Sequence, residues 1–122
     1  MNDPKKHSKL NQLFIERLTS IVMDEMSLGK ISLEMVASKM FITRGQLNRK
    51  VKAITGRTTQ QFAMKVRLTH ASNLLKNNTD MAISEVAFRC GFEDATSFSR
   101  AFRLKYGISP SEYRNDDNLI DI

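Results

Sequence analysis

The hydrophobic residues of this chain recur every three or four positions along almost its whole length. No segment shows the sustained alternation of apolar and polar residues that is typical of a half-buried strand, so the pattern predicts an all-α fold. It predicts helices over about residues 10–26, 33–40, 43–55 and 59–77, followed by shorter ones. In the first helix we expect the inward side chains to be Leu10, Leu13, Phe14, Leu18, Ile21, Val22 and Met26.

Polar signals mark the ends of several of these helices. Thr43 and Gln46 have the spacing of a capping box, in which each side chain bonds the other residue's backbone N–H, and Thr58 and Gln61 repeat it. Gly56 lies just past the third helix, where glycine commonly ends a helix. The sequence therefore predicts sharp starts for the third and fourth helices.

The pattern of residues 36–62 returns about 50 positions later. Val36 and Ala37 return as Val86 and Ala87, displaced by 50 positions. With one extra residue in the second turn, the pairs displaced by 51 positions are Leu47 and Phe98, Arg49 and Arg100, Val51 and Phe102, Lys52 and Arg103, Gly56 and Gly107, and Phe62 and Tyr113. Each copy is a short helix, a tight turn and a second helix ended by glycine, which is the pattern of a helix-turn-helix.

The repeat divides the chain into segments. We expect an all-α protein with two helix-turn-helix units joined by a long connecting helix, and with an extra N-terminal helix. A capping box from Ser109 to Glu112, with Pro110 at the first helical position, adds a last short helix. The predicted segments are an arm and leading helix over 1–30, a first unit over 31–57, the connecting helix over 58–78, a second unit over 79–114 and an acidic tail over 115–122.

Basic residues repeat on the outward faces of the two units. On a wheel of 100° per residue, Arg49 and Lys52 lie opposite the apolar positions of the helix that starts at residue 43. Arg100 and Arg103 lie opposite the apolar positions of the helix that follows residue 94. Because exposed arginine is common, one such pair would mean little, but two pairs in register with a structural repeat favour a shared binding task.

The distribution of charge points to a polyanionic partner. Nineteen Lys and Arg against thirteen Asp and Glu give a net charge of +6, and no acid lies between Glu34 and Asp80. The cations of that stretch are Lys39, Arg44, Arg49, Lys50, Lys52, Arg57, Lys65, Arg67 and Lys76. Surfaces built only for solubility mix both signs, so nucleic acid is the first candidate partner and an anionic membrane surface the second.

The length of the connecting helix suits duplex DNA. Nineteen residues, 59–77, give about 28 Å at 1.5 Å per residue, and the asparagines at 77 and 78 end the helix. One turn of B-DNA is about 34 Å. The helix could therefore hold two recognition helices about one duplex turn apart.

Residues 31–114 resemble the DNA-binding domain of the AraC/XylS family of bacterial transcription regulators. The resemblance is carried by ISLEMVASKM, TRGQLNRKVKAITG and MAISEVAFRCGFEDATSFSRAFRLKYGISPSEYR. The second of these segments is most similar to members fused behind response-regulator or hybrid two-component modules. The family resemblance implies two helix-turn-helix units bound to adjacent major grooves, and activation of transcription through contact with RNA polymerase.

The resemblance also implies which residues meet DNA. Base contacts are expected at Gly45, Asn48, Arg49, Ala95, Thr96, Ser97 and Arg100. Phosphate contacts are expected at Thr43, Arg44, Lys50, Lys52, Arg57, Ser99 and Arg103. Thr96 and Ser97 have helix capping as an alternative role. Two positions depart from the family pattern, because Phe41 occupies a turn position that is usually small and Gly45 offers no side chain.

Other kinds of site are not expected. Cys90 is the only cysteine, and it suits a small buried hydrophobe better than a nucleophile. His7 and His70 are too far apart in the sequence for a metal cluster, and His70 is expected to be solvated or phosphate-facing. With no paired carboxylates or glycine-rich phosphate loop, we expect no enzyme, cofactor or metal. The methionines, including Met35, Met40, Met64 and Met81, are expected in the core.

The expected partners follow from the same features. No apolar run approaches the roughly 18 residues that cross a bilayer, so we expect a cytoplasmic protein with no membrane partner. The expected partners are double-stranded promoter DNA and RNA polymerase. Sensing and dimerisation would belong to other parts of a longer regulator, of which this chain is the C-terminal effector domain.

Two other functions remain open on the sequence alone. A non-specific nucleic-acid-binding helical domain would show steep salt dependence without a preferred sequence, and the polar residues expected at the bases argue mildly against it. A protein-interaction bundle would keep its behaviour when the basic faces are neutralised.

Overall fold

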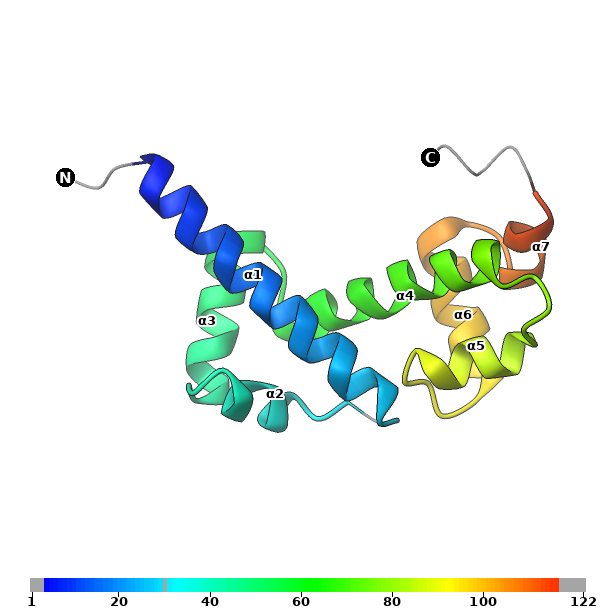
Figure 1. Ribbon diagram of the computed structural model, residues 1–122, viewed down its shortest axis with the longest axis horizontal. Helices are drawn as coiled ribbons and strands as arrows, with labels where there is room; N and C mark the ends of the chain where they lie inside the picture. The colour runs from blue at the N-terminus through cyan, green and yellow to red at the C-terminus, as the bar shows by residue number, and fades with distance from the viewer. Residues whose placement is uncertain (1–3, 30, 117–122) are drawn as a thin grey trace.

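The computed structural model describes residues 4–29 and 31–116, with side chains from residue 8 onward. These residues form seven α-helices and no strand, which confirms the predicted all-α fold (Figure 1). The helices are α1 (Pro4–Ser27), α2 (Leu33–Lys39), α3 (Arg44–Thr55), α4 (Thr59–Asn77), α5 (Ile83–Arg89), α6 (Ala95–Tyr106) and α7 (Pro110–Asn115). Most of the predicted acidic tail, from residue 117 onward, lies outside the described residues.

The two helix-turn-helix units have the same local structure. Helices α2 and α5 have seven residues each, and α3 and α6 have twelve each. In the first turn the Ile42 N–H donates to the Ala37 carbonyl at 3.2 Å, and in the second the Phe92 N–H donates to the Ala87 carbonyl at 3.0 Å. The predicted repeat is therefore a repeat of structure, and the second turn is one residue longer, as predicted.

Side-chain caps fix where the helices start. Both predicted capping boxes form, one from Thr43 to Gln46 and one from Thr58 to Gln61. Asp94 takes the place of Thr43 in the second unit, and its carboxylate accepts from the Ser97 N–H at 2.7 Å. At α7 the structure shows one of the two bonds of the predicted box, from the Glu112 N–H to the Ser109 hydroxyl at 3.2 Å.

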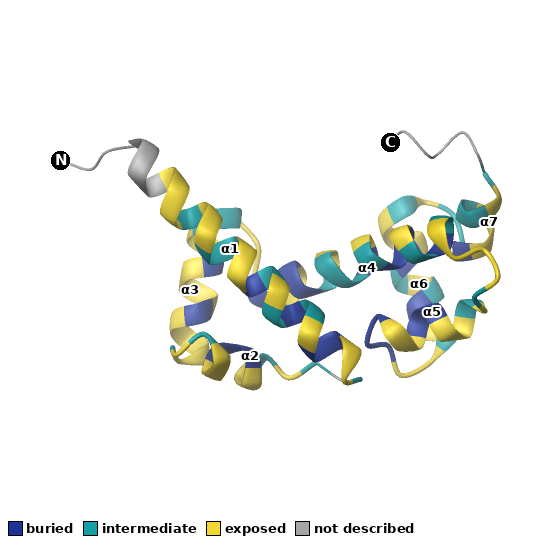
Figure 2. Ribbon diagram, viewed as in Figure 1, coloured by how far each residue is buried: buried dark blue, intermediate teal, exposed yellow. Residues whose placement is uncertain are grey.

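Helix α4 joins the two units and contributes to both hydrophobic cores. Its Phe62 and Ala63 pack in the first core, and its Leu68, Ala71 and Leu75 pack in the second. The remaining buried residues are Leu18, Val22, Val36, Ala37, Leu47 and Val51 in the first core, and Met26, Val86, Ala87, Cys90, Phe92, Phe98 and Phe102 in the second. Figure 2 shows the buried segments, in dark blue, where helices face one another. Because one helix is anchored in both cores, α4 fixes the position of each unit relative to the other.

Helix α1 crosses α4 and packs on the first unit (Figure 1). It starts at Pro4, where proline's missing N–H costs nothing, and not near Leu10 as predicted. Leu10 and Leu13 were expected inward, but they are 55% and 52% exposed. Among the described residues, the first residue of α1 that packs against the first core is Phe14, which follows both leucines.

The methionines that the structure describes, which exclude Met1, follow the core prediction with one exception. Met40 packs against the first core, and Met64 and Met81 pack against the second. Met35 is 49% exposed, so its predicted core position is wrong. It lies in the first half of α2, one position before the residue that enters the core, Val36.

Candidate nucleic-acid interface

In the first unit, α3 presents a polar face to solvent. Asn48, Arg49 and Lys52 are exposed, whereas Leu47 and Val51 on the opposite side are completely buried. These burials confirm the predicted orientation of α3. The polar residues are therefore free of the core.

Gly45 shapes the surface beside Arg49. A Cβ atom built at Gly45 would lie 3.6 Å from Nη1 of Arg49, so the guanidinium rests close to the glycine backbone. The arginine therefore extends toward the N-terminal end of α3, the end that enters a groove in helix-turn-helix proteins. Gly45 can offer only its backbone to a ligand.

In the second unit, α6 presents the equivalent face. Thr96, Arg100 and Arg103 are exposed, and Phe98 and Phe102 on the opposite side are completely buried. The other predicted contacts on α6 are Ala95 and Ser99, which are half-buried, and Ser97, which is exposed. The two recognition helices thus repeat both their buried and their basic sides.

The start of α6 resolves the alternative roles of Thr96 and Ser97. Asp94 is the N-cap residue, so neither Thr96 nor Ser97 occupies the N-cap position. The hydrogen bond from the Ser97 backbone N–H is the main cause that lowers the pKa of Asp94 below its ordinary value. The Ser97 side chain also bonds Asp94, and Thr96 keeps an exposed side chain.

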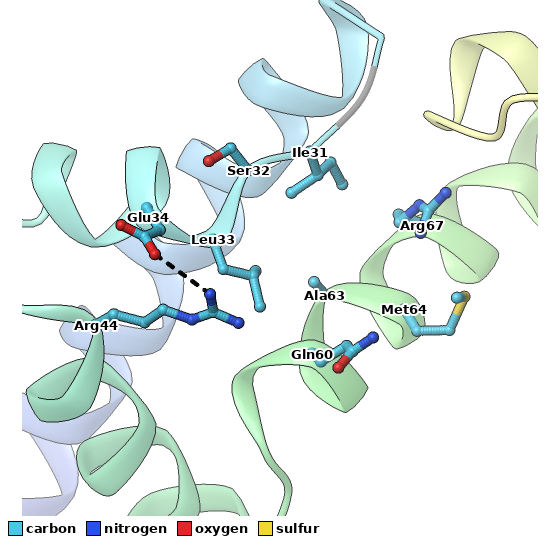
Figure 3. A pocket seen from close by; sticks show the side chains of 9 residues that line it. All are labelled: Ile31, Ser32, Leu33, Glu34, Arg44, Gln60, Ala63, Met64 and Arg67. Carbon is cyan, nitrogen blue, oxygen red and sulfur yellow. Dashed lines mark ion pairs between the residues drawn. The ribbon is translucent and has the colours of Figure 1, made fainter.

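The residues predicted to meet phosphates are in different surroundings. The Thr43 hydroxyl accepts from the Gln46 N–H, and Arg44 lies 3.6 Å from a carboxylate oxygen of Glu34. Figure 3 shows this ion pair at the edge of a cleft of about 500 Å³ between α2 and α4. The ammonium of Lys50 lies 4.6 Å from the centre of the Phe14 ring, so it is directed toward α1. Lys50, Lys52, Arg57 and Arg103 are exposed.

Two cations of the acid-free stretch serve the fold. Lys39 of α2 forms an ion pair with the buried Glu25 of α1. The Arg67 guanidinium donates to the carbonyls of Cys90 and Gly91 at 2.9 and 2.8 Å. The sequence predicted that both cations would be available to a polyanion. No spacing in the sequence indicates that Lys39 pairs with Glu25 or that Arg67 bonds the second turn.

Arg67 holds the turn of the second unit against α4. Besides its two hydrogen bonds, its guanidinium carbon lies 3.9 Å from the centre of the Phe92 ring. Burial is the main cause that lowers the pKa of Arg67 from its ordinary value. This arginine therefore positions α6 indirectly, by fixing the turn that precedes it.

The turn of the first unit holds Phe41, the residue that departs from the family pattern, in a left-handed backbone conformation. Phe41 has a φ of 61°, in the left-handed region, and its side chain is 84% exposed. The Arg17 guanidinium of α1 lies 5.7 Å from the centre of its ring. The equivalent residue of the second unit is Gly91, with a φ of 81°.

Cys90 and His70 lie away from the basic faces. Cys90 is completely buried, as predicted, and burial raises the pKa of its thiol to about 12. His70 is half-buried and lines a cleft between α1 and α4, beside Ile15 and Thr19, so its ring is partly solvated, and a phosphate-facing role stays a prediction. Partial burial lowers the pKa of His70.

Among the described residues, no three His, Cys, Asp or Glu side chains gather into a group that could hold a metal ion. None of the helices α1 to α7 is long and apolar enough to cross a membrane.

Two helix-turn-helix units on one shared helix, each with an exposed basic face, define the class of this domain. A family model described as "Helix-turn-helix domain" matches residues 36–116. The HTH-type transcriptional activator RhaS of Escherichia fergusonii is 37% identical over 84 residues, which cover 69% of this chain and 30% of that protein. The chain therefore spans about a third of the length of this relative.

Solved structures agree with the sequence matches. The C-terminal domain of AraT, a response regulator from Geobacillus stearothermophilus, has a TM-score of 0.73 and 29% identity, over 82% of each chain. The DNA-binding domain of AdpA, a global transcriptional factor solved in complex with a target DNA, has a TM-score of 0.72 and 26% identity, over 82% of this chain and 88% of that one. The chain belongs to the AraC-type helix-turn-helix family of transcription regulator domains, which is not a class of enzymes.

Proposed function

We propose that this chain binds a bipartite site on duplex DNA, with α3 and α6 in two successive major grooves. The observation that carries the proposal is the repeated basic face, Arg49 with Lys52 on α3 and Arg100 with Arg103 on α6, at the two ends of one rigid helix. The bound state of the AdpA domain supports it.

Base readout falls on the exposed centre of each recognition helix. Arginine can donate two hydrogen bonds to the O6 and N7 atoms of guanine, so Arg49 and Arg100 each specify one base pair. Asn48, Thr96 and Ser97 add shorter polar contacts, while Gly45 and Ala95 allow close approach of the backbone. Thr43, Arg44, Lys50, Lys52, Arg57, Ser99 and Arg103 contact phosphates and position the domain.

The regulatory role extends the same proposal. The activator RhaS supports activation of transcription, in which the DNA-bound domain contacts RNA polymerase in the cytoplasm. The response-regulator domain of AraT supports a place behind a two-component receiver. In this role the chain is the effector domain of a longer regulator whose other parts sense the signal and dimerise.

Selection of binding sites from a random duplex library, at near-physiological salt, tests the proposed function. We expect enrichment of two short blocks about 10 base pairs apart, centre to centre, because each unit occupies one groove. Recovery of duplexes with no shared sequence would contradict sequence-specific binding and favour a non-specific binder.

Alanine substitutions test the two arginines on the selected duplex. Arg49→Ala or Arg100→Ala should each weaken binding by about 1 to 3 kcal/mol and relax the preference at one base pair. Arg89→Ala is a control, because this arginine lies on α5 and pairs with Glu85 of the same helix at 3.1 Å. Unchanged affinity and preference in both test variants would show that α3 and α6 do not read bases as proposed.

A further inference from the structure

A second basic feature lies between the two units. A cleft of about 500 Å³ runs between α4 and α6, and Arg57, Lys65 and Lys105 line it. Arg57 follows the end of α3, Lys65 lies on α4, and Lys105 lies in the last turn of α6. We call these three residues the inter-unit cluster.

Lys65 and Arg57 are close enough for their charges to act on Lys105. Partial burial lowers the pKa of Lys105, and the charges of Lys65 and Arg57 lower it further. No acidic side chain is among the described residues that line this cleft. Like charges held together destabilise the unbound domain, so an anion that enters the cleft would relieve an unfavourable interaction.

The position of the cluster suggests which anion it binds. The cleft shares Met64 and Ala101 with a neighbouring cleft that reaches the turn of the second unit at Gly91 and the start of α6 at Ser97. The cluster therefore spans α4 from the end of one recognition helix to the last turn of the other. Between two successive major grooves, duplex DNA presents its sugar–phosphate backbone.

We propose that Arg57, Lys65 and Lys105 together form a site for the backbone phosphates midway between the two half-sites. This inference rests on the proposed function and adds Lys65 and Lys105 to it. Because the three cations come from both units and from the helix that joins them, the cluster is already assembled in the free domain, and it can meet the intervening phosphates when both recognition helices occupy their grooves. Contact with these phosphates therefore accompanies binding by both units.

Charge-neutralising variants of the 122-residue chain test the inter-unit cluster. Lys65→Gln and Lys105→Gln should each make the fall of the logarithm of the association constant with the logarithm of the salt concentration less steep, by about 0.9 in slope. Each should also weaken binding about fivefold at 0.15 M salt. Lys9→Gln makes the same change in net charge on an exposed residue of α1 that does not line the cleft, and should have neither effect. Methylphosphonates placed midway between the half-sites should weaken wild-type binding, and they should weaken each variant by less, because each variant has already lost one of the three cations that meet these phosphates.

Thermal unfolding of the free variants separates binding from folding. Neutralising one of three mutually repelling cations should leave the melting temperature unchanged or raise it. Weaker DNA binding together with a lowered melting temperature would overturn the inference, as would full additivity between the variants and the methylphosphonates. A wild-type chain that binds no duplex overturns the proposed function as well, whereas selective wild-type binding with additive losses overturns only the inter-unit site.

Discussion

Phe41 and Gly91 occupy the same turn position in the two units, but the two turns differ in the space they leave for a side chain. A Cβ atom at Gly91 would lie 2.9 Å from the Gly29 carbonyl oxygen, so the second turn has no room for a side chain. At Phe41 the side chain points into open solvent beside Arg17, so only the left-handed backbone is unfavourable. The first turn therefore tolerates a residue that costs about 1 to 2 kcal/mol in backbone strain.

Substitution of Phe41 should reveal that strain. Both Phe41→Gly and Phe41→Ala remove the ring and its contact with Arg17, but only glycine relieves the strain at positive φ. We expect the glycine variant to be more stable than the alanine variant by about 1 to 2 kcal/mol in denaturant unfolding. Equal stability of the two variants would show that the turn is not strained.

Asp94 gives the start of α6 a dependence on pH. The hydrogen bond from Ser97 lowers the pKa of Asp94 in the folded state, so the unfolded chain binds the proton more readily. The stabilisation is complete above the pKa of a free aspartate, about 3.9, and is lost as the pH falls through the lower folded value. Asparagine keeps an N-cap oxygen but carries no charge.

The Asp94→Asn variant isolates this charge. At pH 7 the wild type should melt at a higher temperature than the variant, and the difference should shrink as the pH falls below 4. A difference that is the same at pH 7 and pH 3 would show that the ionised carboxylate does not stabilise the cap.

Helix α1 contributes to the core of the first unit. Alanine substitutions at two leucines of this helix, one buried and one exposed, test this contribution. Leu18 is completely buried, so Leu18→Ala should cost about 2 to 5 kcal/mol of the free energy of unfolding. Leu13 is 52% exposed, and Leu13→Ala should change it by no more than about 0.5 kcal/mol. Chemical denaturation measures both values, and similar losses in the two variants would contradict the packing of α1.

Much of the molecule follows from local signals in the sequence. The boundaries of α3 and α4 were predictable because Thr43, Thr58 and Gly56 act on their own neighbours. The repeat predicted two similar units and the outward direction of Arg49 and Arg100. Periodicity of this kind reports a helix face without reference to the rest of the fold.

What the sequence did not predict depends on contacts between distant segments. Arg67 counted as one more surface cation, although it bonds a turn more than 20 residues away. Leu10 and Leu13 continue the apolar periodicity of α1 beyond the part of the helix that packs on the first core. Periodicity alone therefore predicted that they would be buried. Lys65 and Lys105 are 40 positions apart, and only the packing of α6 on α4 brings them to one cleft.

In the whole molecule, one rigid helix sets the distance between the two recognition helices. The 19 residues of α4 measure about 28 Å and are anchored in both cores. The domain should therefore accept one spacing of its half-sites, because neither unit can move along the DNA independently of the other.

The most direct test measures affinity for the selected duplex with 5 or 10 base pairs inserted between its half-sites. Five base pairs turn one half-site to the opposite face of the duplex, and ten place it about 68 Å away, beyond the reach of α4. We predict that both insertions reduce the affinity to that of a duplex with a single half-site. Full affinity on either inserted duplex would contradict binding by two rigidly joined units in adjacent grooves.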